Sequence, residues 1–140
     1  MNSLHVARFT VAYWCVFVAV LLPLVCAWLA KSGGFGKPRR EGGYDNHDPR
    51  AWMARQTDWH ARANAAQANS FEALPFFMGA VIIAHQLGAR QTWLDLLAML
   101  FVMLRMFYIM MYVSNMPTAR SAVWAGAFMV NVAILFVGYR

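Results

Sequence analysis

Charged residues and cysteine are both scarce in this sequence. Only 13% of its 140 residues are charged, whereas soluble domains contain about 25%. Hydrophobic residues make up 61%, against about 45–50% in soluble chains. This composition excludes an ordinary soluble domain and predicts a small integral membrane protein. The length predicts a single compact domain over residues 1–140.

The two cysteines and four histidines form no pattern typical of a disulfide or a metal site. Cys15 and Cys26 are eleven residues apart in one apolar run, which is about 16 Å along a helix and too far for a disulfide. CxxC and HExxH spacings are lacking, so we predict no metal site. The net charge is +6, but the aromatic residues lie in the apolar runs and not among the basic residues. That separation argues against a nucleic-acid partner.

Long apolar runs predict four membrane-spanning helices, at about 9–30, 52–86, 92–115 and 119–139. The first run has 22 uncharged residues, enough to cross about 30 Å of hydrocarbon. A signal peptide is the alternative for this run, although the run is long for one. The second apolar run is short, so its helix is expected to begin upstream, near Trp52. The expected fold is an all-α integral membrane four-helix bundle.

The one sizeable polar segment, at about 31–51, separates the first two helices. Gly33, Gly34 and Pro38 prevent the first helix from continuing into it. Its basic residues outnumber its acidic ones: Lys31, Lys37, Arg39, Arg40 and Arg50 against Glu41, Asp45 and Asp48. By the positive-inside rule this loop is cytoplasmic, and both chain termini lie on the other side of the membrane.

Polar residues inside the apolar runs are costly in lipid and must face protein or water. Arg105 lies near the middle of the third helix, and Tyr108, Tyr112 and Asn115 follow it on the same helical face. Glu72 is the only carboxylate deep enough in the second helix to meet this arginine. We therefore predict an ion pair between Arg105 and Glu72.

Further polar residues surround this predicted pair. On the second helix, Arg55, Arg62 and Asn69 are spaced by seven and share one stripe. An arginine–glutamate pair alone can merely fix the register of a bundle. The additional donors, which include Arg120, favour a site for a small anionic ligand that enters from the cytoplasm. Asn131 in the fourth helix is expected to make an interhelical hydrogen bond.

The second helix carries a recognisable order of residues, Arg62-Ala-Asn-Ala-Ala-Gln-Ala-Asn69-Ser-Phe-Glu72-Ala-Leu-Pro75. It resembles the second-helix signature of the MAPEG family, the membrane-associated proteins of eicosanoid and glutathione metabolism. Length, four spans and a long first loop also match, so the resemblance covers nearly the whole chain and looks closest to the bacterial branch. It implies a homotrimer in the bacterial inner membrane, with glutathione bound between subunits near the cytoplasmic side.

The resemblance also implies roles for individual residues. The residues implied to bind glutathione, as a co-substrate, are Arg62, Asn69, Glu72, Arg105, Tyr108 and Tyr112. Arg120 and Ser121 resemble the catalytic Arg-Ser pair of the prostaglandin E synthase branch, in which the arginine stabilises the glutathione thiolate. A guanidinium lowers the pKa of a nearby thiol and so raises its reactive fraction. Arg120 could instead contact lipid headgroups, a common role for an arginine at a helix end.

The resemblance implies a membrane-bound, glutathione-dependent transferase or peroxidase that acts on hydrophobic electrophiles. Ala65 and Ala68 depart from the pattern, because many glutathione-using members have arginines there that hold the glutathione carboxylates. Loss of both contacts costs a few kcal/mol of binding, roughly. Three loop residues are candidates to compensate: Lys37, Arg39 and Arg40. The alternative function is a non-catalytic membrane protein that binds lipids, like the lipoxygenase-activating member of the family.

Overall fold

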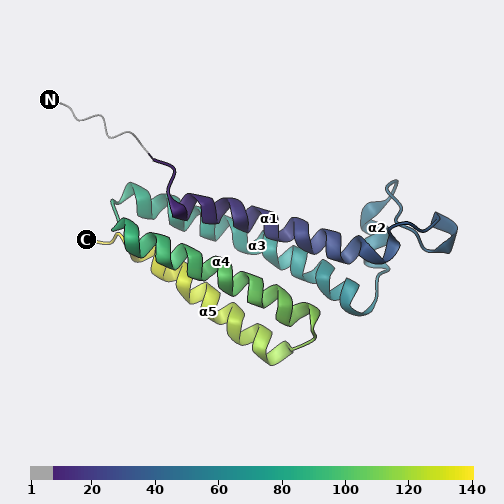
Figure 1. Ribbon diagram of the computed structural model, residues 1–140. Helices are drawn as coiled ribbons and strands as arrows, with labels where there is room; N and C mark the ends of the chain where they lie inside the picture. The colour runs from purple at the N-terminus through teal and green to yellow at the C-terminus, as the bar shows by residue number, and fades with distance from the viewer. Residues whose placement is uncertain (1–7) are drawn as a thin grey trace.

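The computed structural model describes residues 8–140, and every regular element within that range is helical (Figure 1). The elements are α1 (Val11–Lys31), α2 (Pro49–Ala54), α3 (Asp58–Gln86), α4 (Gln91–Val113) and α5 (Pro117–Phe136), with short 3-10 turns at Ser32–Gly34 and Arg39–Glu41. The four long helices lie side by side, with α1 packed along α3 and α4 along α5 (Figure 1). The short α2 sits with the polar loop at one end. The predicted all-α class is confirmed.

Three of the described helical segments are long and apolar enough to cross a membrane: Val11–Gly34, Gln91–Val113 and Pro117–Phe136. Helix α3 is the longest, at 29 residues, but the half nearer α2 is rich in polar side chains and the helix is not in this set. Many large apolar side chains on the outer surface are exposed, among them Trp14, Leu24, Met110 and Met129. An apolar exterior of this kind suits contact with lipid, and the protein is an integral membrane protein.

The helix expected over 52–86 is divided in two, so that prediction is wrong at its beginning. Asp48 caps α2 by accepting a hydrogen bond from the Ala51 amide at 3.3 Å, and Pro49 occupies the first turn. Helix α3 then begins at Asp58, whose φ of 52° is left-handed and cannot continue a right-handed helix from α2. Arg55 therefore lies outside α3 and does not share a helical stripe with Arg62.

The turn between α4 and α5 shortens the polar helical face that was predicted to begin at Arg105. Asn115 has a φ of 58° in the turn after α4, a conformation that asparagine tolerates better than most residues. Its exposed side chain is not on the helical face of Arg105, contrary to the expectation. Pro117 then starts α5, where its missing amide hydrogen costs nothing.

The beginning of α1 is held by residues from α3 and α4. Asp95 of α4 accepts a hydrogen bond from the Ala12 amide at 2.9 Å, and Thr10 accepts one from the Tyr13 amide at 3.3 Å. The Thr10 hydroxyl also bonds to the His85 ring at 2.9 Å. Amide hydrogens at the start of a helix have no partner within the helix. Here Asp95 of α4 and the N-cap Thr10 satisfy two of them, and the bonds to Asp95 and His85 tie the start of α1 to α4 and α3.

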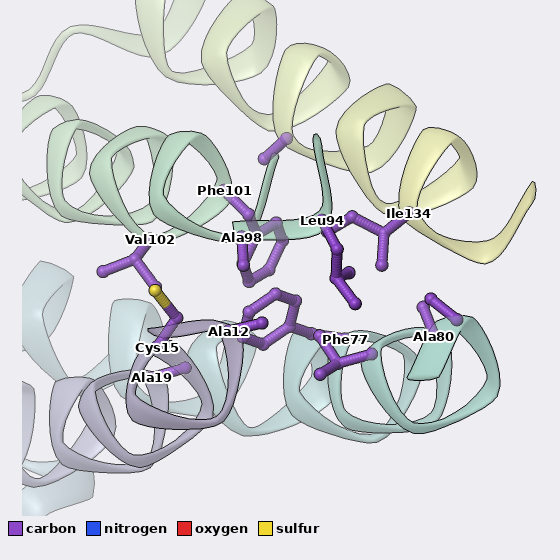
Figure 2. Close-up of a cluster of buried hydrophobic side chains, with 13 residues drawn as sticks. Ala12, Cys15, Ala19, Phe77, Ala80, Leu94, Ala98, Phe101, Val102 and Ile134 are labelled. Atoms are coloured by element: carbon purple, nitrogen blue, oxygen red, sulfur yellow. The ribbon is translucent and has the colours of Figure 1, made fainter. Parts of the chain in front are cut away.

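The largest buried cluster joins α1, α3, α4 and α5, as Figure 2 shows. Phe77 of α3 is fully buried and stacks on Phe101 of α4, with 4.1 Å between the ring centroids. Alanines surround this pair, including Ala12, Ala80 and Ala98. Small side chains let the helix backbones approach closely, which is a principal source of helix association in lipid.

Phe77→Ala should destabilise the protein strongly. Removing the ring empties a packed site and costs about 3–5 kcal/mol, since the surrounding helices relax only partly. The measurement is the melting temperature of the detergent-solubilised protein. The control is Phe107→Ala on α4, whose ring is 42% exposed. Equal losses for the two variants would show that the Phe77–Phe101 stack does not stabilise the fold.

Candidate functional site

A buried arginine lies at the centre of the candidate site. Arg105 on α4 is 3% exposed, and its Nη2 donates to Asn69 Oδ1 at 2.8 Å and to Ser70 Oγ at 3.5 Å. The guanidinium also lies over the Tyr108 ring, 4.2 Å from its centroid. Neutral oxygens and an aromatic face can stabilise a cation within an apolar helix pair. The partners of Arg105 therefore come from α3 and from its own helix.

The predicted partner of Arg105 is wrong. The ion pairs found in residues 8–140 lie in the loop after α1, and Arg105 reaches Glu72 only through Asn69, whose Nδ2 donates to Glu72 Oε2 at 3.4 Å. The cause is helical rotation. At about 100° per residue, Ser70 and Glu72 lie on opposite sides of Asn69. A guanidinium held between Asn69 and Ser70 therefore lies on one side of Asn69, and Glu72, which is exposed on α3, lies on the other.

Five of the predicted site residues line one cavity of about 250 Å³, which we call the polar cavity. Helices α3, α4 and α5 contribute its walls: Asn69, Tyr108, Tyr112, Arg120, Ser121 and Trp124. The Arg120 guanidinium lies 4.3 Å from the centroid of the Tyr112 ring, and Tyr112 meets Tyr108 edge to face at 5.7 Å. The cavity thus combines one cation with hydroxyl and amide groups, a set that suits an anionic, hydrogen-bonding ligand.

A second cavity of about 250 Å³, the apolar cavity, adjoins the polar one, because Asn69 and Trp124 line both. Aromatic rings form much of its wall: Phe76, Phe101, Trp124 and Phe128. Glu72 and Arg105 also line it, so these two predicted site residues face this cavity although they do not pair with each other. A polar and an apolar compartment therefore meet at Asn69 and Trp124.

Arg62 lies apart from both the polar and the apolar cavity. Its Nε donates to the carbonyl oxygen of Val113 at 2.9 Å, and it is not among the residues that line the polar or the apolar cavity. The last carbonyl groups of a helix lack partners within it. Arg62 satisfies one of them at the end of α4, and its expected contact with glutathione stays a prediction.

A third cavity, of about 410 Å³, lies on the other side of α3, and we call it the basic cavity. Lys31 of α1 and Arg50 of α2 line it, together with the amides Asn64 and Gln67. Ala68 lines it as well, so an arginine at that position would share a cavity that already holds two cations. Neither Lys31 nor Arg50 belongs to the loop residues that we expected to compensate for Ala65 and Ala68.

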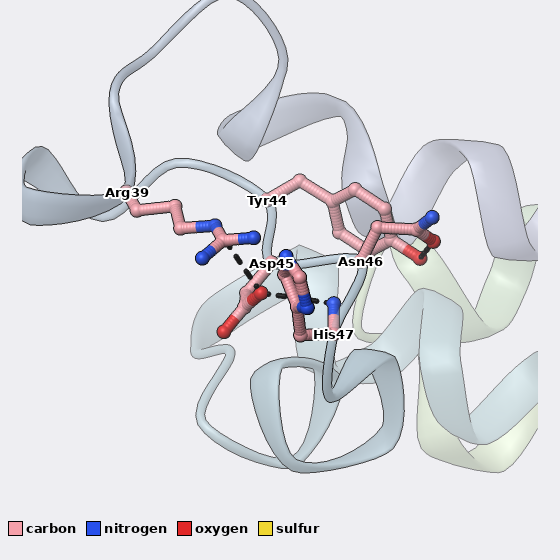
Figure 3. Close-up of polar contacts among 5 residues, drawn as sticks. All are labelled: Arg39, Tyr44, Asp45, Asn46 and His47. Carbon is pink, nitrogen blue, oxygen red and sulfur yellow. Dashed lines mark hydrogen bonds and ion pairs between the residues drawn. The ribbon is translucent and has the colours of Figure 1, made fainter.

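Two of those loop residues are engaged elsewhere. Arg39 pairs with Asp45 at 3.4 Å, a contact that Figure 3 shows within the loop, and Arg40 pairs with Glu41 at 3.8 Å. Asp45 also accepts a hydrogen bond from the His47 amide at 2.9 Å (Figure 3). These carboxylates hold the loop arginines beyond the end of α1. Lys37, the third candidate, is exposed.

Two polar residues of the site were missed or misjudged from the sequence. Ser70 directly follows Asn69, and adjacency on a helix gives no periodic signal that would mark it as a partner of Arg105. Asn131 was expected to make an interhelical hydrogen bond. In the described part of the chain, Asn131 Oδ1 is buried and has no hydrogen-bond partner, while the residue lines the apolar cavity.

Comparison with known proteins identifies the family of the chain. The model of the MAPEG family matches residues 11–139. The chain belongs to the MAPEG family. The MAPEG match includes all five helices and all three cavities, and membership indicates a role in glutathione-related or eicosanoid metabolism. The chain has no match among the curated proteins or the solved structures compared with it.

Asn69→Leu should lower the melting temperature more than Glu72→Gln. The first change removes the closest acceptor of a buried cation, and a hydrogen bond to a charged group contributes about 1.5–3 kcal/mol. The second change leaves the Arg105 contacts in place. Asn64→Leu, on the other side of α3, controls for loss of an amide. A larger loss of melting temperature for Glu72→Gln than for Asn69→Leu would show that Glu72 pairs directly with Arg105.

Proposed function

We propose that the protein is a membrane-bound, glutathione-dependent transferase or peroxidase that acts on hydrophobic electrophiles. The observation that carries the proposal is the meeting of the polar and apolar cavities at Asn69 and Trp124. A water-soluble thiol suits the polar cavity, which contains Arg120 and Ser121. A lipid-soluble electrophile suits the aromatic walls of the apolar cavity. Adjoining compartments bring such reactants together, which lowers the entropic part of the barrier.

Arg120 and Ser121 are the residues that we assign to the chemistry. Glutathione supplies the nucleophilic sulfur. The Arg120 guanidinium favours the thiolate over the thiol by charge, and the Ser121 hydroxyl can donate a hydrogen bond to the sulfur. In a transfer, the sulfur bonds to the electrophilic carbon while the leaving group departs with its electron pair. The thiol proton has by then passed to solvent, so charge and atoms balance.

We also propose a homotrimer of four-helix subunits in the bacterial inner membrane, with α3 as a fourth span and the 31–51 loop in the cytoplasm. The surplus of basic residues in the loop supports this orientation. Glu72 supports the assembly, because its carboxylate is exposed near the middle of α3. A charge at that depth is costly in lipid. A neighbouring copy that places a cation or hydrogen-bond donors against Glu72 would reduce this cost.

The basic cavity fits the same proposal. Family members that use glutathione often carry arginines where this chain has Ala65 and Ala68. Here Lys31 and Arg50 line the cavity that Ala68 also lines. We propose that these two cations bind the carboxylates of glutathione held against a neighbouring copy. Lys31 and Arg50, which are distant from positions 65 and 68 in the sequence, would thereby replace the two missing arginines.

The alternative function is a non-catalytic protein that binds lipids in the membrane. The aromatic walls of the apolar cavity favour this alternative, as do the alanines at 65 and 68. A protein that only presents a lipid does not need a cation beside a thiol. Arg120 therefore distinguishes the two functions.

Arg120→Leu should lower turnover about 100-fold, the size of effect seen when one donor to a developing charge is removed. Glutathione affinity should fall much less than turnover, because the contact acts mainly on the reactive state of the sulfur. The ultraviolet absorbance of the bound thiolate should disappear, and Arg120→Lys should restore part of both signals. The assay uses glutathione and a generic aryl halide, normalised to folded protein.

Arg90→Leu is the matched control, because Arg90 is an exposed cation at the other end of α4. It should leave both the absorbance and the turnover unchanged. Unchanged turnover in Arg120→Leu would show that Arg120 does not stabilise a thiolate. It would favour a contact between Arg120 and lipid headgroups.

The double variant Lys31→Gln with Arg50→Gln should weaken glutathione binding at least tenfold. Each charge-assisted hydrogen bond contributes about 1.5–3 kcal/mol, and about 1.4 kcal/mol corresponds to a factor of ten. Calorimetry on the solubilised protein measures the affinity. The control is Arg39→Gln with Arg40→Gln, which removes two loop cations that already pair with carboxylates. Equal affinities in the two double variants would exclude the basic cavity from binding.

A further inference from the structure

The apolar cavity contains one unexplained polar group. Asn131 lines the cavity and is 3% exposed, and its Oδ1 has no hydrogen-bond partner among residues 8–140. Nearly all buried polar atoms in proteins are hydrogen-bonded, so an unpaired amide oxygen calls for a partner from outside the chain. The thiol chemistry proposed above makes no use of Asn131.

Helix geometry places Asn131 at the end of the apolar cavity that is farther from the polar cavity, which we call its inner end. Helices α3 and α5 run in the same direction, away from α2 and the α4–α5 turn (Figure 1). Asn131 follows Trp124 by two helical turns on the face of α5 that lines the cavity. It lies about 16 Å further along the axis than Arg120. The charged lining residues, Glu72 and Arg105, belong to the end nearer the polar cavity.

The surroundings of Asn131 do not suit a lone water molecule. The neighbouring walls on α3, α4 and α5 are Phe76, Phe101 and Phe128. A buried water is held by two to four polar partners, roughly. At the inner end, among the residues that line the cavity, the Asn131 amide is the one such partner. An organic molecule that fills the aromatic space and also carries a polar group satisfies both requirements.

We infer that the apolar cavity binds a small apolar molecule that carries a hydroxyl group, and that the Asn131 amide holds this hydroxyl. A hydroxyl both donates and accepts, so it can pair with either end of an amide. The cavity, at about 250 Å³, holds one ring or a short chain segment of the ligand, since sites for drug-sized molecules span about 300–1,000 Å³. As a statement about the substrate, the inference rests on the proposed function. The proposed enzyme then prefers hydroxylated electrophiles, with the reactive carbon toward Arg120.

The test compares two ligands that differ in one donor, p-bromophenol and p-bromoanisole. The bromine quenches tryptophan fluorescence on contact, and Trp124 lines the cavity. In the solubilised protein without glutathione, p-bromophenol should bind about tenfold more tightly than p-bromoanisole, after correction for uptake into detergent. Asn131→Leu should bring this ratio close to one and leave the affinity for p-bromoanisole nearly unchanged. Trp124→Phe should remove most of the quenching.

Asn64→Leu serves as the control, because it replaces an amide that lines the basic cavity, and it should keep the tenfold ratio. If Asn131→Leu does not fold, the rise in melting temperature of the unchanged protein with each ligand still tests whether the hydroxyl tightens binding. Equal binding of the two ligands, or a ratio that survives Asn131→Leu, overturns the inference. The ratio should also persist in Arg120→Leu. Absence of glutathione-dependent turnover in the unchanged protein, together with an intact ratio, would therefore refute the enzyme and leave the hydroxyl site standing.

Discussion

A guanidinium buried between apolar helices is the constraint on which the rest of the site depends. Arg105 keeps its charge under all ordinary conditions, so it must find oxygens inside the protein. Asn69 and Ser70 supply them from α3 at 2.8 and 3.5 Å, and this contact sets the rotation of α3 against α4. The same rotation turns Glu72 outward and brings Asn69 to the boundary of two cavities. The buried Arg105 guanidinium thereby determines where the polar cavity ends.

Much of this arrangement could be predicted from the sequence, and the errors have physical causes. Periodicity on α4 identified Arg105, Tyr108 and Tyr112 as one face, and the structure brings both tyrosines to the polar cavity. The partner of Arg105 was misidentified because charge favoured Glu72, whereas the rotation of α3 presents Asn69 and Ser70, which precede Glu72 by three and two residues. Such a rotation depends on tertiary packing and cannot be predicted from a single sequence.

The backbone break before α3 and the state of Asn131 differ in how far the sequence signals them. Thr57 and Asp58 are residue types favoured at the start of a helix, and aspartate tolerates a left-handed φ better than most residues, so the break at Asp58 has a local signal that the predicted continuous helix passed over. A polar residue in an apolar helix usually finds a partner across the interface. That Asn131 lacks one depends on the empty space between three helices, a property of volumes rather than of residue types.

The bond from the Ala12 amide to Asp95 has a consequence for biosynthesis. The donor and the acceptor are 83 residues apart. While a ribosome is still making the later part of the chain, Thr10 can already cap the Tyr13 amide, but the Ala12 amide lacks its carboxylate partner. The tie between the start of α1 and α4 therefore forms only when α4 arrives, and the first helix to be made completes its contacts among the last.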